Sequence, residues 1–319
     1  MAFFIVGALH TFYKFVVLTG NCMQLHSRIA PTPSGYLHAG NALNFVLTWL
    51  LVRSTGGTLR LRIDDLDAPR MQPQFLADVF DTLNWLQLDW DLGPQTPGEH
   101  TNSFAQSLRV QQYQSLITKL QNTGLVFACK CSRSQIGATP YTGTCIPLHL
   151  PYNTVDTALR IQTPAESSIQ FHDELKGDVS VDLFEVMRHF IIRRRDGILA
   201  YQIASLVDDL QYGINTLVRG EDLLHSTAAQ LYLANLAGLN SFTQNKFYHH
   251  ALLKGDDGQK LSKSAGSQSL QWWRAQHTTP EKFYLYLSKL MGFGQPAASL
   301  PEMLQQFKAN SKVVMLRLA

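Results

Sequence analysis

The sequence contains little charge, few cysteines and no long uninterrupted apolar run. Charged residues make up 16% of the 319 residues, 45% are hydrophobic, and the formal net charge is only +3. This composition excludes an intrinsically disordered chain and fits one elaborated globular domain or two. The small net charge excludes a globally basic nucleic-acid binder, so any contact with nucleic acid must come from a local basic surface. No internal repeat or low-complexity segment is visible.

Residues 1–22 are apolar enough to suggest a signal sequence, but they lack a basic stretch before the apolar run. His10 and Lys14 interrupt that run short of membrane-spanning length. Because Met23 directly precedes the first well-patterned segment, we expect translation to begin there and residues 1–22 to lie outside the fold. An exported protein is the alternative. We expect a cytoplasmic monomer with no membrane partner.

The cysteines are few and unevenly placed. Three of the four lie in CKCSRSQIGATPYTGTC, from Cys129 to Cys145, while Cys22 stands alone. A spread-out disulfide framework is therefore not indicated. A close cluster in a chain of this size predicts a metal site in a reducing compartment.

Strand-like and helix-like stretches alternate from Leu25 onward. HSRIAPTP (26–33) reads as a strand and turn, NALNFVLTWLLVRST (41–55) as a helix, and GGTLRLRIDD (56–65) as a strand. PQFLADVFDTLNWLQL (73–88) reads as the next helix, with one apolar face formed by Leu76, Val79, Phe80, Leu83 and Leu86. This alternation predicts an α/β fold with a mostly parallel sheet covered by helices.

The pattern is interrupted in the middle of the chain. Strand signals become short and Gly and Pro frequent up to about Asp182, after which FIIRRRDGILAY (190–201) reads as a strand or hairpin that resumes the β–α alternation. We therefore expect an insertion within the sheet domain. The expected division is 23–110 for the first half of the sheet domain, 111–187 for the insertion, 188–245 for the second half, and 246–319 for a lysine-bearing loop and a helical tail.

Two segments carry candidate chemistry. The first is the turn Pro31 to Gly35 followed by His38, Ala39, Gly40 and Asn41, where the first strand runs into its helix. Free N–H groups and the helix dipole favour a phosphate there, and His38 would add a hydrogen bond to growing negative charge. Taken alone, this turn fits an ordinary capped helix start better.

The second segment is KGDDGQKLSKS, from Lys254 to Ser264, a glycine- and aspartate-bearing loop with two lysines in its last five residues. Such a loop suits the grip of a polyphosphate. By itself it would be read as a solvated turn, and it gains significance only together with the first segment.

The pair HAGN and KLSKS resembles the HIGH and KMSKS motifs of class I aminoacyl-tRNA synthetases. Four blocks in order resemble the glutamyl/glutaminyl-tRNA synthetase group: RIAPTPSGYLHAGN (28–41), LRIDDLDAPR (61–70), LVDDLQYGINTLVRGEDLL (206–224) and KLSKS (260–264). The resemblance implies a Rossmann-like parallel sheet split by an insertion, with ATP, Mg²⁺, glutamate and tRNA as substrates and partners.

The same resemblance assigns roles to matching positions. ATP would contact Pro33, His38, Gly40, Asn41, Lys260, Ser262 and Lys263, with His38, Lys260 and Lys263 as catalytic residues. Glutamate would contact Arg28, Ile29, Ala30, Pro31, Thr32, Asp64, Tyr201 and Arg219. Asp64 would hold the α-ammonium and the arginines the carboxylates, which suits a ligand with two carboxylates and one ammonium. Without the family context, Asp64 and Arg219 would read as a surface ion pair and Tyr201 as a core residue.

The implied chemistry has two steps. The glutamate carboxylate attacks the α-phosphorus of ATP while Mg²⁺, His38 and Lys263 stabilise the charge, and a tRNA hydroxyl then captures the acyl-adenylate. No protein nucleophile is required.

The cysteine cluster also has a counterpart. Cys129, Cys131, Tyr141 and Cys145 resemble the zinc-binding insertion of the short glutamyl-tRNA synthetase paralogues, in which a tyrosine takes the fourth ligand position. Three thiolates fit a structural Zn²⁺ site. His149 competes with Tyr141 for the fourth position, and three free cysteines remain the alternative.

Only 55 residues follow Ser264, so we expect no anticodon-binding domain. This matches the truncated glutamyl-Q tRNA(Asp) synthetases, and the resemblance implies transfer of glutamate to the queuosine base of tRNA(Asp). Alternatives are a truncated enzyme that charges a tRNA 3′ end and a non-catalytic paralogue that binds tRNA or a nucleotide. Two positions depart from the family pattern: Asp64 stands where a glutamate is usual, and Asn41 where a small residue or histidine is usual.

Overall fold

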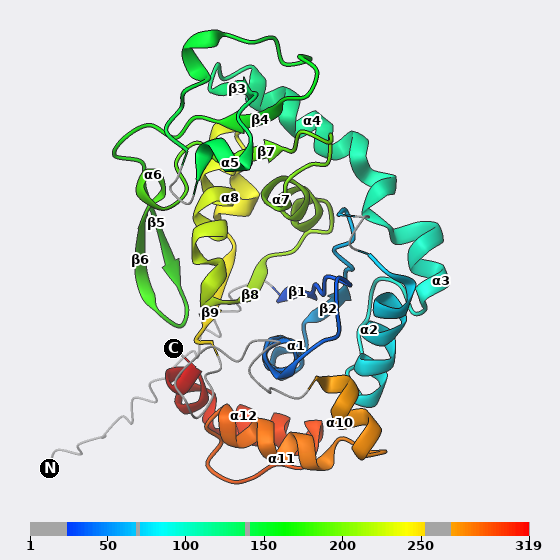
Figure 1. Ribbon diagram of the computed structural model, residues 1–319. Coiled ribbons are helices and arrows are strands. Elements are labelled where there is room, and N and C mark those ends of the chain that lie inside the picture. Colours follow the sequence, from blue (N-terminus) through cyan, green and yellow to red (C-terminus); the bar gives the residue numbers. More distant parts are fainter. Residues whose placement is uncertain (1–23, 68–70, 138–140, 253–268, 319) are drawn as a thin grey trace, which may run out of the picture.

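The central element is a parallel sheet built from both halves of the chain (Figure 1). The computed structural model describes residues 24–67, 71–137, 141–252 and 269–318. Strand β1 (His26–Ile29) pairs in parallel with β2 (Thr58–Leu61), and β8 (Thr216–Gly220) pairs in parallel with β9 (Lys246–His250). The pairs meet where Asn215 N–H donates to the His26 carbonyl at 3.0 Å and the Ser27 hydroxyl to the Thr216 carbonyl at 2.8 Å. β1 and β8 share no continuous ladder, but these contacts bring the two parallel pairs side by side in the order β2, β1, β8, β9, so segments far apart in sequence meet here.

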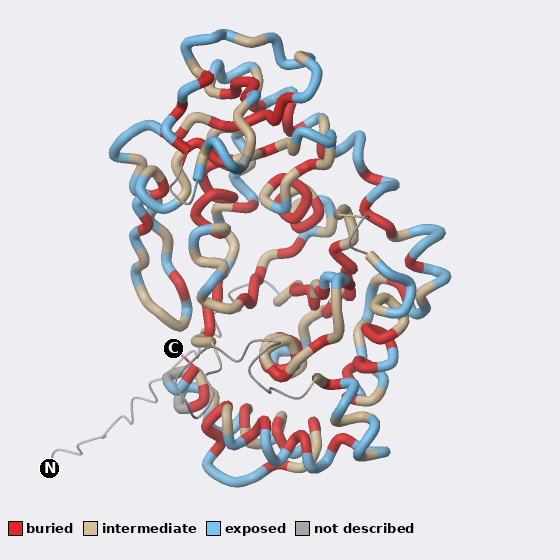
Figure 2. Tube along the Cα trace, in the orientation of Figure 1, coloured by how far each residue is buried: buried red, intermediate tan, exposed pale blue. Residues whose placement is uncertain are grey.

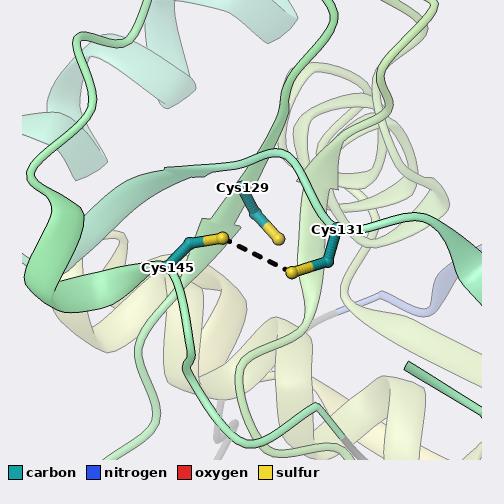
Figure 3. Close-up of side chains that lie close together, drawn as sticks. All are labelled: Cys129, Cys131 and Cys145. Carbon is teal, nitrogen blue, oxygen red and sulfur yellow. Dashed lines mark hydrogen bonds between the residues drawn. The ribbon is translucent and has the colours of Figure 1, made fainter. Parts of the chain in front are cut away.

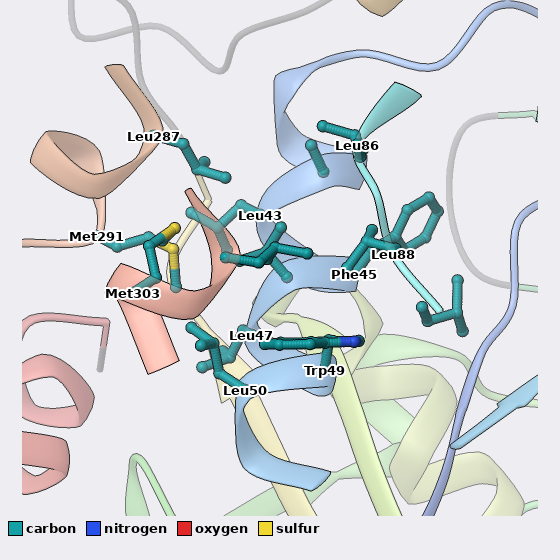
Figure 4. Close-up of a cluster of buried hydrophobic side chains, with 14 of the residues drawn as sticks. Leu43, Phe45, Leu47, Trp49, Leu50, Leu86, Leu88, Leu287, Met291 and Met303 are labelled. Atoms are coloured by element: carbon teal, nitrogen blue, oxygen red, sulfur yellow. The ribbon is translucent and has the colours of Figure 1, made fainter. Parts of the chain in front are cut away.

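Helix α1 (Ala39–Thr55) connects β1 to β2 and is buried on nearly all sides. It begins at His38 and ends at Gly56, whose φ of 67° is the left-handed conformation that stops a helix. Leu43, Leu47 and Leu50 face Leu287, Met291 and Met303 from the C-terminal helices, whereas Phe45 and Trp49 lie toward Leu86 and Leu88 (Figure 4). A helix that is apolar all round needs cover on all sides.

The remaining helices surround this centre. In the first half they are α2 (Pro73–Trp85), α3 (Pro97–Glu99), the π-helical turn η2 (His100–Phe104), the 3₁₀ turn η3 (Gln106–Arg109) and α4 (Val110–Gln121). After the insertion come α7 (Tyr201–Gln211), the 3₁₀ turn η5 (Glu221–Leu223), α8 (Leu224–Leu236) and α9 (Asn240–Thr243). The tail forms α10 (Leu270–Gln276), α11 (Glu281–Leu290) and α12 (Leu300–Leu318).

The expected apolar face of α2 is confirmed. Val79, Phe80 and Leu83 on the helix and Leu86 just after it are buried in one core, and Leu76 packs against it half-buried. This first core surrounds α1 and the tail helices, while a second lies around α4, α7 and α8. Figure 2 shows the buried segments concentrated along these helices and the sheet strands.

The middle of the chain forms two antiparallel units. Strands β3 (Val126–Cys129), β4 (Ala158–Ile161) and β7 (Ile191–Arg193) make a three-stranded sheet with the small helical turns α5 (Arg133–Ile136) and η4 (Ile146–Leu148) beside it. Strands β5 (Ser168–Asp173) and β6 (Gly177–Asp182) form a hairpin, followed by α6 (Leu183–Val186). The prediction of a strand or hairpin at 190–201 is confirmed by β7 and the antiparallel bridge between Arg193 and Leu199. The expectation that this strand resumes the parallel sheet is wrong, because β7 pairs antiparallel with β4.

The β5–β6 hairpin extends the central sheet. Asp173, the last residue of β5, pairs with Phe247 of β9 in parallel, so the sheet order continues β8-β9-β5-β6. The middle segment therefore adds strands β5 and β6 to the sheet of β8 and β9, and strands β3 and β4 to a separate antiparallel sheet. Within the parts of the chain that are described, no helix is long and apolar enough to cross a membrane.

Candidate active site

A cavity of about 370 Å³ opens at the carboxyl ends of β1 and β8. Among the predicted site residues, it is lined by Arg28, Ala30, Pro31, Thr32, His38, Gly40, Asn41, Tyr201 and Arg219. These residues come from two segments separated by more than 150 positions. The edge where parallel strands end is the usual ligand site of such sheets, so the geometry brings most of the candidate residues to one place.

The other predicted residues lie elsewhere. Ile29 and Pro33 are buried and do not line the cavity. Asp64 lines a second cavity of about 600 Å³, which shares Thr32 and Tyr201 with the first. Lys260, Ser262 and Lys263 lie outside the described residues. Tyr201 is 36% exposed, so it is not a core residue, and Arg219 is buried, so it is not part of a surface ion pair.

The helix start at His38 serves as a cap and as part of the cavity wall. His38 Nδ1 accepts from the Gly40 N–H at 3.1 Å, and the Asn41 side-chain oxygen accepts from the His38 N–H at 3.0 Å. A β-carbon at Gly40 would lie 3.0 Å from His38 Cε1, a contact tight enough that the ring would have to shift. With Nδ1 acting as acceptor, a neutral His38 ring carries its proton on Nε2, which makes Nε2 the donor.

A buried carboxylate organises the arginines of the cavity. Asp209 on α7 accepts from Arg28 Nε at 2.8 Å and from Arg62 Nη1 at 2.6 Å. Arg219 Nη2 lies 3.6 Å from its other oxygen. Burial raises the pKa of Asp209, but the three arginines outweigh burial and hold the pKa below its ordinary value. Asp209 is therefore an anion that positions arginines from β1 and β8.

Asp64 is tied to the same cluster through Arg62. Arg62 Nε donates to Asp64 Oδ1 at 2.6 Å and Nη2 to Oδ2 at 3.2 Å, and burial raises the pKa of Asp64. Three arginines and two aspartates give the cluster one excess positive charge. A buried excess of this sign favours an anionic ligand.

Arg219 has the clearest unmet hydrogen-bonding capacity. It is 2% exposed, and its Nε and Nη2 have no hydrogen-bond partner among the residues described. Burial lowers the pKa of the Arg219 guanidinium. Buried polar groups nearly always have partners, and the Nε–Nη2 edge of arginine matches a carboxylate in a two-point contact. Arg219 therefore fits a carboxylate ligand in the cavity.

Sequence reasoning missed Arg62, Asp208 and Asp209 as site residues. Asp208 accepts from Arg109 Nε at 2.8 Å and from the Tyr113 hydroxyl at 2.8 Å, which ties α7 to the first half of the chain. The signal was present in the quoted blocks LRIDD and LVDDL, because charged residues inside otherwise apolar elements must find partners when buried.

The three clustered cysteines come together at the edge of the β3–β4–β7 sheet (Figure 3). The sulfurs of Cys129, Cys131 and Cys145 all lie within 4.8 Å of one another. Tetrahedral Zn–S bonds of 2.3 Å separate sulfurs by ~3.8 Å, so this spacing fits a zinc ion. Burial raises the pKa of Cys145, but hydrogen bonds, led by that of Tyr141, outweigh it and lower the pKa to about 7.

The two candidates for a fourth ligand differ in position. The Tyr141 hydroxyl accepts from the Cys145 N–H at 2.7 Å and lies 3.8 Å from the Cys131 sulfur. His149 is exposed and does not belong to the group of potential ligands formed by the cysteines. The geometry therefore favours Tyr141.

Comparison with known proteins identifies the class. The sequence profile of the tRNA synthetases class I (E and Q), catalytic domain, matches residues 24–142 and 151–316. The chain belongs to this family, and the resemblance inferred from the motifs is confirmed.

Particular relatives narrow the class further. "Glutamyl-Q tRNA(Asp) synthetase" of Symbiobacterium thermophilum is 37% identical over 298 residues, covering 88% of this chain and 90% of the relative. The protein of the same name from Pseudomonas putida KT2440 is 37% identical over 270 residues, covering 84% and 83%. "Glutamate--tRNA ligase 2" of Syntrophus aciditrophicus is 36% identical over 309 residues, covering 91% of this chain and 63% of its own, so the chain spans less than two thirds of that relative.

A solved structure supports the fold. The glutamate-tRNA synthetase from Elizabethkingia anophelis superposes with a TM-score of 0.73 at 22% identity, covering 88% of this chain and 65% of that chain. The α/β class I synthetase fold with Rossmann-like parallel elements is thereby confirmed.

Proposed function

We propose that this protein activates glutamate with ATP and transfers it to a tRNA, with the queuosine base of tRNA(Asp) as acceptor. The observation that carries the first half is the cavity in which the buried Arg28 and Arg219 meet the helix start of the HAGN segment. The arginines supply the positive charge for the carboxylates of glutamate, and the positive end of the dipole of α1 favours the ATP phosphates at the helix start.

Different residues bind glutamate and stabilise the phosphate charge in the activation step. Arg219 and Arg28 bind carboxylate groups, and Asp64 keeps lone pairs beyond those used by Arg62 with which to accept from the ammonium. His38 donates from Nε2 to the phosphate charge, and Lys260 and Lys263 neutralise the pyrophosphate as it leaves. Mg²⁺ bound with ATP supplies further neutralisation of the phosphates.

The second cavity supports a site for the acceptor. It adjoins the first through Thr32 and Tyr201, and its lining is about half apolar, with Asp67, Arg160 and Arg194 among the charged residues. Polar groups of both signs on a partly apolar wall suit a base that carries several hydroxyls. The choice of queuosine rests on the two relatives named glutamyl-Q tRNA(Asp) synthetase.

We further propose that Cys129, Cys131, Cys145 and Tyr141 hold a structural Zn²⁺ that orders the insertion. The spacing of the three sulfurs and the nearness of the Tyr141 hydroxyl support this set. Residues 111–187 as the insertion and 23–110 and 188–245 as the halves of the catalytic domain remain our proposed division. In that division the residues of β7 belong to the second half of the catalytic domain, although β7 pairs with β4 of the insertion.

Exchange of pyrophosphate into ATP tests the activation step. With glutamate present, the protein should exchange label, and it should do so poorly with aspartate or glutamine. Absence of exchange with all three amino acids rules out the enzyme and leaves the non-catalytic nucleotide- or tRNA-binding paralogue.

Mapping of labelled glutamate on tRNA tests the acceptor. Two preparations of tRNA(Asp) form the matched pair: one carries queuosine in the anticodon, and the other carries guanosine in its place. After nuclease digestion, label should appear in the anticodon fragment of the queuosine-containing tRNA alone. Label on the terminal adenosine of both preparations would identify the 3′-end charging enzyme.

A further inference from the structure

Behind Arg219 lies a buried row of three polar side chains from three different elements. Arg219 Nη1 donates to the Thr227 hydroxyl at 2.7 Å, the Thr227 hydroxyl lies 2.9 Å from His249 Nε2, and His249 Nδ1 lies 2.6 Å from Asp173 Oδ2. Thr227 is on α8, His249 on β9, and Asp173 at the end of β5 in the inserted hairpin.

The hydrogen bonds of this row can run in only one direction. Arginine has no acceptor, so Thr227 accepts from it. The ionised Asp173 carboxylate can only accept, so His249 carries its proton on Nδ1 and donates it there. In a neutral ring Nε2 is then an acceptor, and the Thr227 hydroxyl donates to it. Burial lowers the pKa of His249. Burial raises the pKa of Asp173, but the interactions with His249 and the N–H groups of Leu175 and Lys176 together outweigh burial and lower it, so the neutral ring and the anion match this direction.

Asp173 is itself fixed in place. Its second oxygen accepts from the N–H groups of Leu175 at 2.9 Å and Lys176 at 3.0 Å, in the turn between β5 and β6. The row therefore starts from a carboxylate held by backbone and ends on a guanidinium that lines the first cavity.

The order hydroxyl, imidazole, carboxylate resembles the arrangement of a hydrolytic triad, but burial excludes that use. Thr227, His249 and Asp173 are all 0% exposed, so no substrate reaches the hydroxyl. The hydroxyl oxygen is also engaged by Arg219, which would oppose attack on a carbonyl.

We propose that Thr227, His249 and Asp173 form a buried positioning chain that holds the Arg219 guanidinium so that its Nε–Nη2 edge binds a carboxylate of the amino-acid substrate. The inference rests on the proposed function, since it assigns a substrate to the cavity. It makes the inserted hairpin a determinant of amino-acid binding, because Asp173 belongs to that hairpin. Asp209 attracts the Arg219 guanidinium by charge, but at 3.6 Å from Nη2 it makes no hydrogen bond that would fix the orientation of the guanidinium.

Kinetics of pyrophosphate exchange test the chain. Thr227→Val removes the hydroxyl at nearly constant volume, and His249→Gln and Asp173→Asn interrupt the next two links. Each should raise KM for glutamate about ten- to a hundredfold, the effect of a lost hydrogen bond to a charged group, while KM for ATP stays within about twofold. Thr227→Ser keeps the hydroxyl and should restore the wild-type KM for glutamate.

The same hairpin provides matched controls. His172 and Asp178 form an exposed pair with an Nδ1–Oδ1 distance of 2.8 Å. His172→Gln and Asp178→Asn make the same chemical changes without touching Arg219, and their KM for glutamate should equal that of the wild type.

The outcomes separate the two proposals. Normal KM for glutamate in folded Thr227→Val and His249→Gln, or an equal rise of KM for ATP, overturns the positioning chain. If Thr227→Val does not fold, His249→Gln alone decides. If the wild type shows no exchange at all, the proposed function fails, and protection by glutamate against thermal unfolding then tests the positioning chain. Protection of the wild type that is lost in His249→Gln supports the chain. Absence of protection in the wild type overturns the chain as well.

Discussion

At the scale of single residues, Gly40 shows how one position serves two constraints. Its N–H donates a hydrogen bond to His38 Nδ1. The absence of a β-carbon leaves room for the His38 ring, whose Cε1 would lie 3.0 Å from a β-carbon at this position. Asn41 completes the cap by accepting from the His38 N–H. The departure at Asn41 from the usual family residue thus has a structural role, because the asparagine oxygen caps the helix.

Lys263 carries a prediction that rests on the KLSKS segment, since the residue lies outside the described structure. Lys263→Ala should lower the rate of glutamate-dependent pyrophosphate exchange by at least about a hundredfold, the effect of losing one preorganised donor in a transition state. Lys282→Ala, at an exposed position on α11, is the control and should leave the rate unchanged. A near-normal rate for Lys263→Ala would mean that the loop has another role.

At the scale of elements, the loop after α2 packs closely against β2. Leu61 N–H donates to the Leu92 carbonyl at 2.9 Å, and Gly93 follows with a φ of 104°. A β-carbon at Gly93 would lie 2.1 Å from the Leu61 carbonyl oxygen. This close approach fixes the outer side of β2, the strand that leads into Arg62 and Asp64.

Gly93→Ala should therefore destabilise the protein. We expect the free energy of unfolding to fall by about 2 kcal/mol or more, from the unfavourable φ together with the contact. The control is Gly98→Ala on α3, where the new β-carbon meets no atom within 4 Å. Denaturant unfolding of both variants measures the difference, and equal stability of the two would contradict the packing argument.

The cysteine cluster is the second test at this scale. The purified protein should hold about one zinc ion per chain, and Cys131→Ser should lose it. Tyr141→Phe should weaken zinc binding at least about tenfold, whereas His149→Ala should leave it unchanged. Metal analysis and competition with a chelator measure these effects, and loss of zinc from His149→Ala alone would assign the fourth position to His149.

At the scale of the whole molecule, α7 ties β1, the end of β2 and η3 together although these elements lie about 90 or more positions earlier in the chain. Asp209 binds Arg28 of β1 and Arg62 beyond β2, while Asp208 binds Arg109 of η3 at 2.8 Å. Both aspartates are 0% exposed. Removal of one charge leaves its buried partners uncompensated, so these pairs affect the stability of the entire sheet.

Asp209→Asn should lower the free energy of unfolding by about 3–5 kcal/mol at pH 7. The pKa of Asp209 is held below its ordinary value of 3.8. A depressed pKa stabilises the fold in full above about pH 4, and this contribution is lost as the pH falls through the folded-state pKa. The difference between wild type and variant should therefore shrink below about pH 4.

Denaturant titrations at pH 7 and pH 3.5 measure this convergence. Asp178→Asn is the control, because the Asp178 side chain is 97% exposed, and it should differ little from the wild type at both values of pH. A constant difference between wild type and Asp209→Asn across this range would show that folding does not lower the pKa of Asp209.

The sequence by itself determined the local features of this protein. Its β–α alternation, the glycine turn into α1, the apolar face of α2 and the four ordered blocks indicated the α/β fold and the family, because these signals depend on residues close together in the chain. The same spacing brought Cys129, Cys131 and Cys145 into one predicted cluster. Strand pairing was harder to predict from the sequence, as β7 shows, because the partner of an edge strand is set by tertiary packing.

Only the tertiary structure decided the charge network of the site. Asp209 contacts Arg28 across 181 positions and Arg62 across 147, and Asp173 reaches His249 across 76. No local pattern specifies such pairs, since each aspartate could be solvated or buried until the sheet closes. Once the sheet forms, burial makes partners obligatory, and the structure thereby selects which charges act on the cavity and leaves Arg219 with an open edge.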